Sequence, residues 1–119
     1  MITIKERVRA CLEGACGELV YGYPRDFTGS ELVSWRESGN SRHAQADGRE
    51  HLAELEYSVD IFASSPEEAG EILALADGRL QELGMRRQAA AEQFEQDTAL
   101  SHISARYRAL ADAQGRIYQ

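Results

Sequence analysis

The sequence contains little that could cross-link a small fold or carry it into a membrane. Among its 119 residues only Cys11 and Cys16 are cysteines, and their spacing matches no zinc-binding pattern, which would need further ligands. No apolar run approaches the length of a membrane span, and the N-terminus lacks the apolar region of a secretion signal. These absences predict a cytoplasmic chain with reduced cysteines, no membrane partner and a hydrophobic core that needs no cross-links.

Basic charge is also scarce. Lys5 is the only lysine, the other basic residues are arginines, and the formal net charge is −7. This balance argues against a general nucleic-acid binder, which needs a basic face. The preference for arginine is typical of protein interfaces, and codon usage in a GC-rich genome is the alternative explanation. With 43% hydrophobic and 28% charged residues the chain is expected to fold, and its length suits one domain over residues 1–119.

The signatures of common enzymes are missing. The sequence has no glycine-rich phosphate loop and no glycine-flanked serine of the hydrolase type. Its three histidines, His43, His51 and His102, lie at no metal-binding spacing. We therefore predict no enzyme, with no catalytic residue, no cofactor and no metal site. A hydrolase that uses His43 or His51 is the enzymatic alternative.

The clearest pattern that is present is an alternation over residues 52–63. The odd positions are apolar, and the even positions from 54 to 60 are Glu54, Glu56, Ser58 and Asp60. A β-strand turns successive side chains to opposite faces, so the alternation predicts a strand with one buried and one acidic face. Such a strand is typical of an antiparallel sheet that packs on one side only.

Two helices are predicted, one on each side of this strand in the sequence. Residues 3–15 begin with a capping box in which Thr3 is the N-cap and a glutamate follows three residues later. Residues 65–83 begin with Ser65 as N-cap and a proline at the first helical position, and Gly84 is expected to end this helix. Both segments repeat apolar residues at helical spacing, which predicts one buried face for each.

Shorter patterns complete the expected fold. Further strands are predicted over residues 19–23, 31–38, 85–97, 101–111 and 116–119. The fold class expected is α+β, a two-layer sandwich in which a mixed, mostly antiparallel sheet of about four to five strands carries two helices on one face. Residues 39–50 have no apolar anchor and are predicted to form a long loop, either functional or disordered.

Charged residues gather on the polar side of the expected sheet. Residues 54–60 are acidic there, and Arg106 and Arg108 lie on the corresponding side of residues 101–111. Opposite charges on neighbouring strands either pair within the sheet or bridge two subunits. The candidate inter-subunit or partner interface comprises these charges with the basic residues of the expected loop: Arg42, His43, Arg49, Glu54, Glu56, Asp60, Arg106 and Arg108.

Several segments together resemble a known family. They are Val20-Tyr21-Gly22-Tyr23-Pro24, Val33-Ser34-Trp35, residues 56–62 followed by Ser-Pro-Glu-Glu-Ala, Leu83-Gly84-Met85-Arg86-Arg87, Glu95-Gln96-Asp97, residues 103–107 and Gly115-Arg116-Ile117-Tyr118. In this order, over nearly the whole chain, they resemble the tail-completion and tail-terminator proteins of long-tailed bacteriophages, including prophages and phage-derived particles.

The resemblance implies a role in virion assembly. It implies a hexameric ring on the head-proximal end of the tail tube that stops tube polymerisation and provides the docking surface for the head connector. The implied partners are the tail tube protein on one side and a connector or stopper protein on the other, with DNA passing through the lumen without sequence-specific binding. The implied location is the neck of the virion, after assembly in the host cytoplasm. The alternatives are another neck component, or a small cytoplasmic ligand-binding domain.

Overall fold

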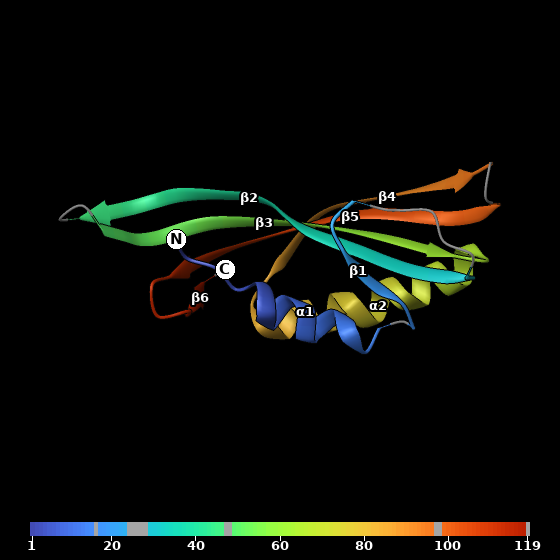
Figure 1. Ribbon diagram of the computed structural model, residues 1–119, viewed down its shortest axis with the longest axis horizontal. Coiled ribbons are helices and arrows are strands. Elements are labelled where there is room, and N and C mark those ends of the chain that lie inside the picture. The colour runs from blue at the N-terminus through green and yellow to red at the C-terminus, as the bar shows by residue number, and fades with distance from the viewer. Residues whose placement is uncertain (16, 24–28, 47–48, 97–98, 119) are drawn as a thin grey trace.

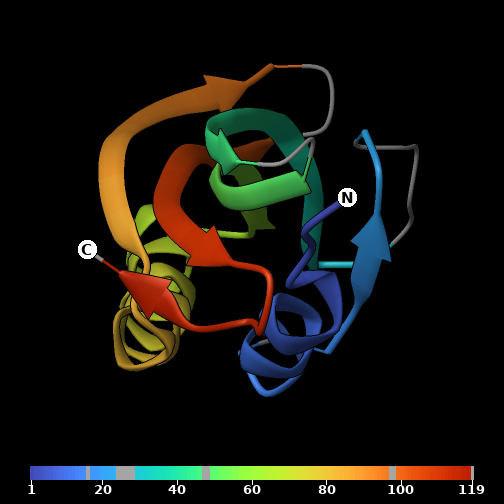
Figure 2. The ribbon, with the colours of Figure 1, turned by 90° about the vertical axis from the view of Figure 1, so that its left-hand side faces the viewer.

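The computed structural model describes residues 1–15, 17–23, 29–46, 49–96 and 99–118, and the chain forms two layers (Figure 1). The elements follow the order α1 (Lys5–Glu13), β1 (Leu19–Tyr21), β2 (Glu31–Ala46), β3 (Arg49–Ala63), α2 (Pro66–Leu83), β4 (Arg86–Glu95), β5 (Leu100–Asp112) and β6 (Ile117–Tyr118). Both helices lie on the same side of the sheet, which curls over them in the end-on view (Figure 2). The predicted α+β class is confirmed.

The sheet contains six strands in the order β1-β2-β3-β5-β4, with β6 paired to β5. The short β1 runs parallel to β2, and the other pairs are antiparallel. The sheet is therefore mixed and mostly antiparallel, as expected. Its sixth strand, β6, lies within the short strand predicted at residues 116–119 and exceeds the four to five strands expected for the fold class. Neither described helix is long and apolar enough to cross a membrane.

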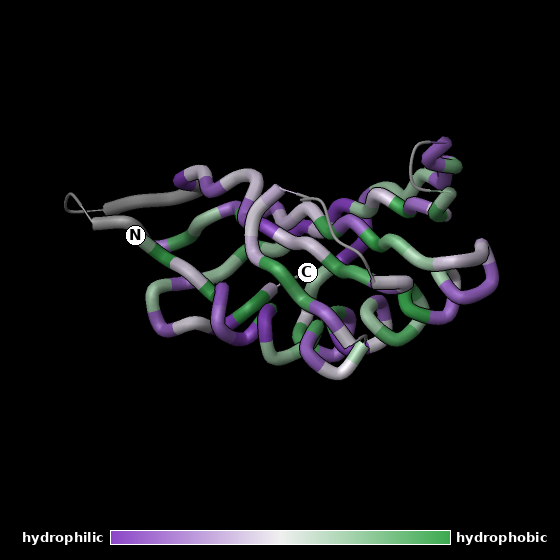
Figure 3. Tube along the Cα trace, turned by 45° about the vertical axis from the view of Figure 1, so that its right-hand side comes forward, coloured by the Kyte–Doolittle hydropathy of each residue, from purple (hydrophilic) through white to green (hydrophobic). Residues whose placement is uncertain are grey.

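β3 is the centre of the core. Its odd positions from Ala53 to Ala63 are fully buried, which confirms the predicted alternation. β5 places its own odd positions from Ile103 to Ala111 on the same side, and Tyr57 and Tyr107 lie directly opposite each other. Hydrophobic residues concentrate between the sheet and the helices (Figure 3). Each buried valine, leucine or isoleucine of this set contributes about 1.5–3 kcal/mol through the loss of apolar surface from water, and the alanines contribute less.

α2 begins and ends where the sequence predicts. The Ser65 hydroxyl accepts a hydrogen bond from the Glu68 backbone N–H at 3.2 Å, and Gly84 ends the helix in the left-handed conformation at φ 112°. A side chain at Gly84 would also meet Ile117, because a Cβ there would lie 2.8 Å from the Ile117 side chain. Ala69, Ile72, Ala76 and Leu80 face the sheet and are buried.

The predicted capping box of α1 is wrong. Ile4 occupies the N-cap position without a side-chain cap, and the Thr3 hydroxyl instead accepts a hydrogen bond from the Lys5 backbone N–H at 3.3 Å. Ile2 and Ile4 are both buried, so packing of these two side chains sets the path of the chain into the helix. Core contacts outweigh the cap because burying an isoleucine is worth more than one exposed capping bond.

The predicted long loop at residues 39–50 is also wrong. β2 continues to Ala46 and β3 begins at Arg49, so residues 39–46 and 49–50 are strand. The hairpin extends past the helices and gives the molecule an elongated shape of 52 × 24 × 21 Å (Figure 1). Beyond the helices neither sheet face needs apolar side chains, and register shifts between Glu37 and Gly39 and between Arg42 and Gln45 break the alternation. The polar sequence of residues 39–50 is therefore typical of a loop, although the backbone of its described residues is paired as strand.

β4 confirms the strand predicted over residues 85–97, in which apolar and polar residues alternate only weakly. It pairs with β5 along one side, and almost all of its side chains are exposed, including Phe94 at 64%. An edge strand with little cover on either face has no reason to alternate apolar and polar residues. This position explains why its sequence pattern is weak.

Candidate functional site

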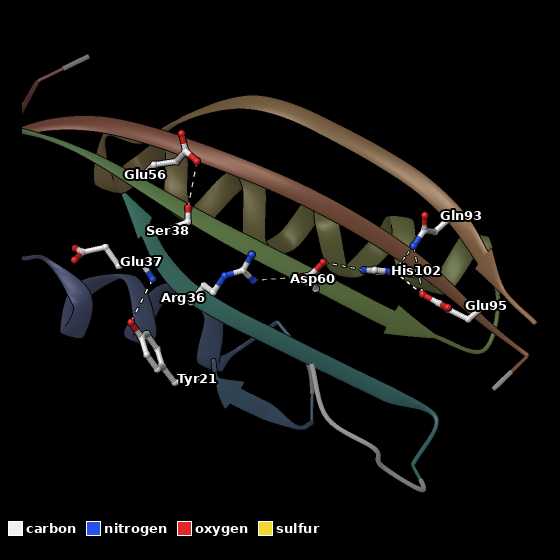
Figure 4. A network of polar contacts seen from close by, with 9 residues as sticks. All are labelled: Tyr21, Arg36, Glu37, Ser38, Glu56, Asp60, Gln93, Glu95 and His102. Carbon is white, nitrogen blue, oxygen red and sulfur yellow. Dashed lines mark hydrogen bonds and ion pairs between the residues drawn. The ribbon is translucent and has the colours of Figure 1, made fainter. Parts of the chain in front are cut away.

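The face of the sheet that the helices do not cover carries the charged residues. We call it the polar face and define it by Arg36 of β2, Glu54, Glu56 and Asp60 of β3, and His102, Arg106 and Arg108 of β5. Alternation along the three strands places these side chains on the side opposite the buried tyrosines. Figure 4 shows Arg36, Glu56, Asp60 and His102 on this face.

Asp60 is the most buried acid of the polar face, with 7% of its surface exposed. Its Oδ1 lies 2.8 Å from His102 Nε2, and its Oδ2 lies 3.5 Å from Arg36 Nη1 (Figure 4). A carboxylate held away from water needs such partners, because burying an unpaired charge is costly. Asp60 is thus an internal link between β2 and β5, and its partners are different from the predicted Arg106 and Arg108.

His102 is nearly buried and contacts both polar and aromatic groups. Its Nδ1 lies 2.9 Å from Glu95 Oε1 and 2.9 Å from Gln93 Nε2, both on β4. Its ring stacks on Phe62 with 4.2 Å between the ring centres. Both ring nitrogens therefore have polar partners, Asp60 at Nε2 and the two β4 side chains at Nδ1. The ring therefore connects β3, β5 and the edge strand β4 through one side chain.

Glu54 and Glu56 make different contacts from Asp60. Glu54 Oε1 lies 2.7 Å from Arg108 Nε, which is the predicted pairing of opposite charges across neighbouring strands. Glu56 Oε1 accepts a hydrogen bond of 3.3 Å from the Ser38 hydroxyl (Figure 4). The Glu54–Arg108 pair is about 40% exposed at both side chains, so it contributes about 0–1 kcal/mol to stability.

Arg106 of this face and the neighbouring Arg86 of β4 have no acidic partner among the described residues. Arg106 lies opposite Ser58, and Arg86 at the start of β4 lies directly opposite Arg108. Like charges on directly opposite residues destabilise a strand pair. Arg86 was not among the predicted interface residues, because its neighbour across the sheet depends on a register that the sequence does not reveal.

The remaining candidates lie on the β2–β3 hairpin. Arg42 is exposed on β2 opposite Ala53. His43 lies on β2 and Arg49 on β3, opposite Ala46, and their side chains are outside what the structure describes. The structure therefore separates the eight predicted residues into two groups, three on the hairpin and five on the polar face.

The histidines do not assemble a catalytic group in the described part of the chain. His51 is exposed on β3, and His102 is held in the network with Asp60. Among the described residues no group of three or more His, Cys, Asp or Glu side chains is placed to hold a metal ion.

Two buried tyrosines donate hydrogen bonds to carboxylates, Tyr57 within the sheet and Tyr107 between the sheet and α2. The Tyr57 hydroxyl donates to Glu37 at 2.8 Å, and the Tyr107 hydroxyl donates to Asp77 of α2 at 2.8 Å. Burial, followed by the hydrogen bond to the neighbouring carboxylate, raises the pKa of both hydroxyls far above the usual value. They remain protonated donors, so their role is to satisfy acceptors at the edge of the core.

Comparisons with known proteins identify a fold. No protein-family model matches the chain, and no curated protein matches it. Among solved structures, the fold is similar to a chain in the virion of a native gene transfer agent (GTA) particle, with a TM-score of 0.58 and 12% sequence identity. The match covers 97% of this chain and 91% of that chain. The two chains share one arrangement of helices and strands along almost their whole lengths.

Proposed function

We propose that this chain is a structural component of a phage or phage-derived particle and acts as its tail terminator. It forms a ring, with six copies expected, on the head-proximal end of the tail tube. The ring stops tube growth and provides the surface to which the head connector docks. The observation that carries this proposal is the similarity of fold, over 97% of the chain, to a component of a gene transfer agent virion. The family resemblance of the sequence points to the same class of particle.

The shape of the molecule supports an assembly role. A two-layer body presents one helical and one polar sheet face, and a ring needs two different surfaces that contact each other head to tail. The β2–β3 hairpin extends beyond the helices, and beyond Trp35 the outer edge of β2 pairs with no further strand of the described residues, which leaves it available to a neighbour. The expected partners are the tail tube protein and a head-connector or stopper protein.

The charge of the chain supports the passage of DNA. A net charge of −7 disfavours tight binding of a polyanion, so DNA would move through the lumen without sequence-specific contacts. No step of this role requires a cofactor or a catalytic residue.

Deletion of the gene in the strain that produces the particles tests the proposal. We expect tail tubes of irregular, excessive length and heads without tails in negative-stain images, and normal particles after complementation with the wild-type gene. Tails of normal length that fail to join heads would contradict the terminator role and indicate another neck component. Normal particles after deletion would exclude both.

A further inference from the structure

A pocket lies where β4 and β6 meet the same edge of β5. Arg86 of β4 pairs with Arg108, and Tyr118 of β6 pairs with Leu110 two residues further along β5. The space between them has a volume of about 300 Å³ and is lined by Arg86, Gln88, Arg108, Ala109, Leu110 and Tyr118. We call it the β4–β6 pocket. It combines two guanidinium groups with apolar surface from a leucine and a tyrosine.

The positive charge at this pocket is not balanced within the described part of the chain. Arg108 forms an ion pair with Glu54, whereas Arg86 and Arg106 form no ion pair with the described residues. The three arginines lie on adjacent positions of two paired strands, in a chain whose net charge is −7. Neighbouring arginines repel one another and so destabilise the sheet. An acidic surface bound to them would neutralise this repulsion, because carboxylates form strong hydrogen bonds with arginine.

The outer side of α2 carries the complementary chemistry. Glu67, Glu71 and Leu75 recur every four residues and are all exposed, on the side of the helix opposite its buried residues. We call this stripe the α2 ridge. Leu75 is 51% exposed, and Gly78 leaves open space one turn further on. The ridge therefore presents one apolar side chain next to two carboxylates that form no ion pair among the described residues.

We propose that the α2 ridge of one copy docks into the β4–β6 pocket of the next copy. Leu75 then packs against Leu110 and Tyr118, and the two glutamates approach the arginine cluster. The two surfaces lie on opposite layers of the molecule, so each copy offers both at once and the contact repeats in one direction. The inference rests on the proposed function, because it identifies the contact that closes the proposed ring.

Charge and shape together favour a second copy over another occupant. The ridge supplies both the acidic and the apolar groups that the pocket lacks. Phe94 is a larger exposed apolar residue, but it lies on a strand, near the far end of β4, and is not part of an acidic helix surface such as the α2 ridge. It therefore serves as a matched control for the loss of an exposed apolar side chain.

Sedimentation velocity on the purified full chain, over a series of concentrations, tests the contact. We expect Leu75→Ser and Arg86→Glu each to weaken self-association by about tenfold or more, and Phe94→Ser to leave it unchanged. Combining Arg86→Glu with Glu71→Arg should recover most of the loss, because the charges are exchanged across the contact. All four positions are on the surface, so circular dichroism should show the wild-type fold.

Three results would overturn the inference. They are a wild-type chain that stays monomeric at all concentrations, variants at Leu75 and Arg86 that associate normally, and a loss at Arg86 that the exchanged pair does not recover. The last result would assign the pocket to an acidic partner other than this chain. The proposed function fails independently of these outcomes, since it is tested by tail length after gene deletion.

Discussion

The Nε2 atom of His102 lies 2.8 Å from Oδ1 of Asp60, on diagonally related positions of two neighbouring strands. This contact connects the polar face across β3 and β5, and Arg36 and Glu95 extend it to β2 and β4. The acidic residues of this face therefore differ in burial and in role. Asp60 is a buried structural link, whereas Glu54 and Glu56 stay partly exposed.

Removing the Asp60 carboxylate should destabilise the fold. Asp60→Ala leaves His102 and Arg36 without a shared acceptor, so we expect the free energy of unfolding to fall by about 1–3 kcal/mol. Urea denaturation followed by circular dichroism measures this change. Glu56→Ala is the matched control, because its carboxylate is less buried, and its effect should stay within about 0.5 kcal/mol. Equal effects of the two variants would show that the network around His102 does not stabilise the sheet.

The core side of the sheet gives larger effects. Tyr57 and Ile61 are fully buried, so truncating either to alanine should reduce the free energy of unfolding by about 2–5 kcal/mol. Tyr57→Phe should cost about 0.5–1.5 kcal/mol, because it keeps the buried ring and removes the polar contacts of the hydroxyl, among them the hydrogen bond to Glu37. Chemical denaturation of the three variants checks the order. A phenylalanine variant as unstable as the alanine variant would show that the hydroxyl, and not the ring, determines the stability.

The sequence predicted secondary structure best for the segments that pack against the core. Residues 52–63 pack on one side only, so their alternation predicted the strand and its buried face. Residues 39–46 extend past the helices, where packing places no demand on the side chains. The pair Asp47-Gly48 between the strands was the one available signal for a hairpin, since Asp-Gly is typical of two-residue turns.

The candidate site was less predictable than the fold. Which charges meet depends on strand register, and alternation leaves open any shift of two residues, because such a shift keeps every side chain on its face. Glu54 and Arg108 pair as expected, yet Asp60 reaches His102 and not an arginine of β5, because the register places Asp60 opposite Ser104, two residues from His102. Arg86 lies beside Arg108 because β4 is next to β5, and this neighbour relationship does not follow from the sequence.

The C-terminal strand should depend on pH through Asp112. Burial acts to raise the pKa of this carboxyl, but hydrogen bonds from Arg116, Tyr118 and Gln114 outweigh it and lower the pKa from 3.8 to about 2. A folded-state pKa below the unfolded value means that the carboxylate stabilises the fold above pH 3.8. This contribution is lost as the pH falls through about 2.

We therefore expect the wild-type chain to lose more stability between pH 4 and pH 2 than Asp112→Asn, which cannot titrate at this position. Urea denaturation at a series of pH values compares the two chains. Parallel curves for the wild type and the variant would contradict the proposed role of Asp112 in holding Arg116 and Tyr118.

The β2–β3 hairpin can be shortened to separate its role in folding from its role in assembly. Ala44 and Leu52 are cross-strand partners, so replacing residues 45–51 with Asn-Gly joins them through a two-residue turn. The deleted residues include no buried core side chain among those that the structure describes. We expect the free energy of unfolding to change by about 0.5 kcal/mol or less, as for other changes outside the core.

Assembly should respond differently, because the deletion removes Arg49 and shortens the part of the hairpin that extends past the helices. If the hairpin contacts a neighbour or a partner, the shortened chain folds but does not restore normal tails when it complements a deletion strain. Thermal unfolding and negative-stain images of complemented particles give the two readouts. The matched control is Arg49→Ala in the full-length hairpin, which removes the charge and keeps the strands. Normal tails with the shortened chain would remove the hairpin from the assembly mechanism and leave the polar face and the β4–β6 pocket as the contact surfaces.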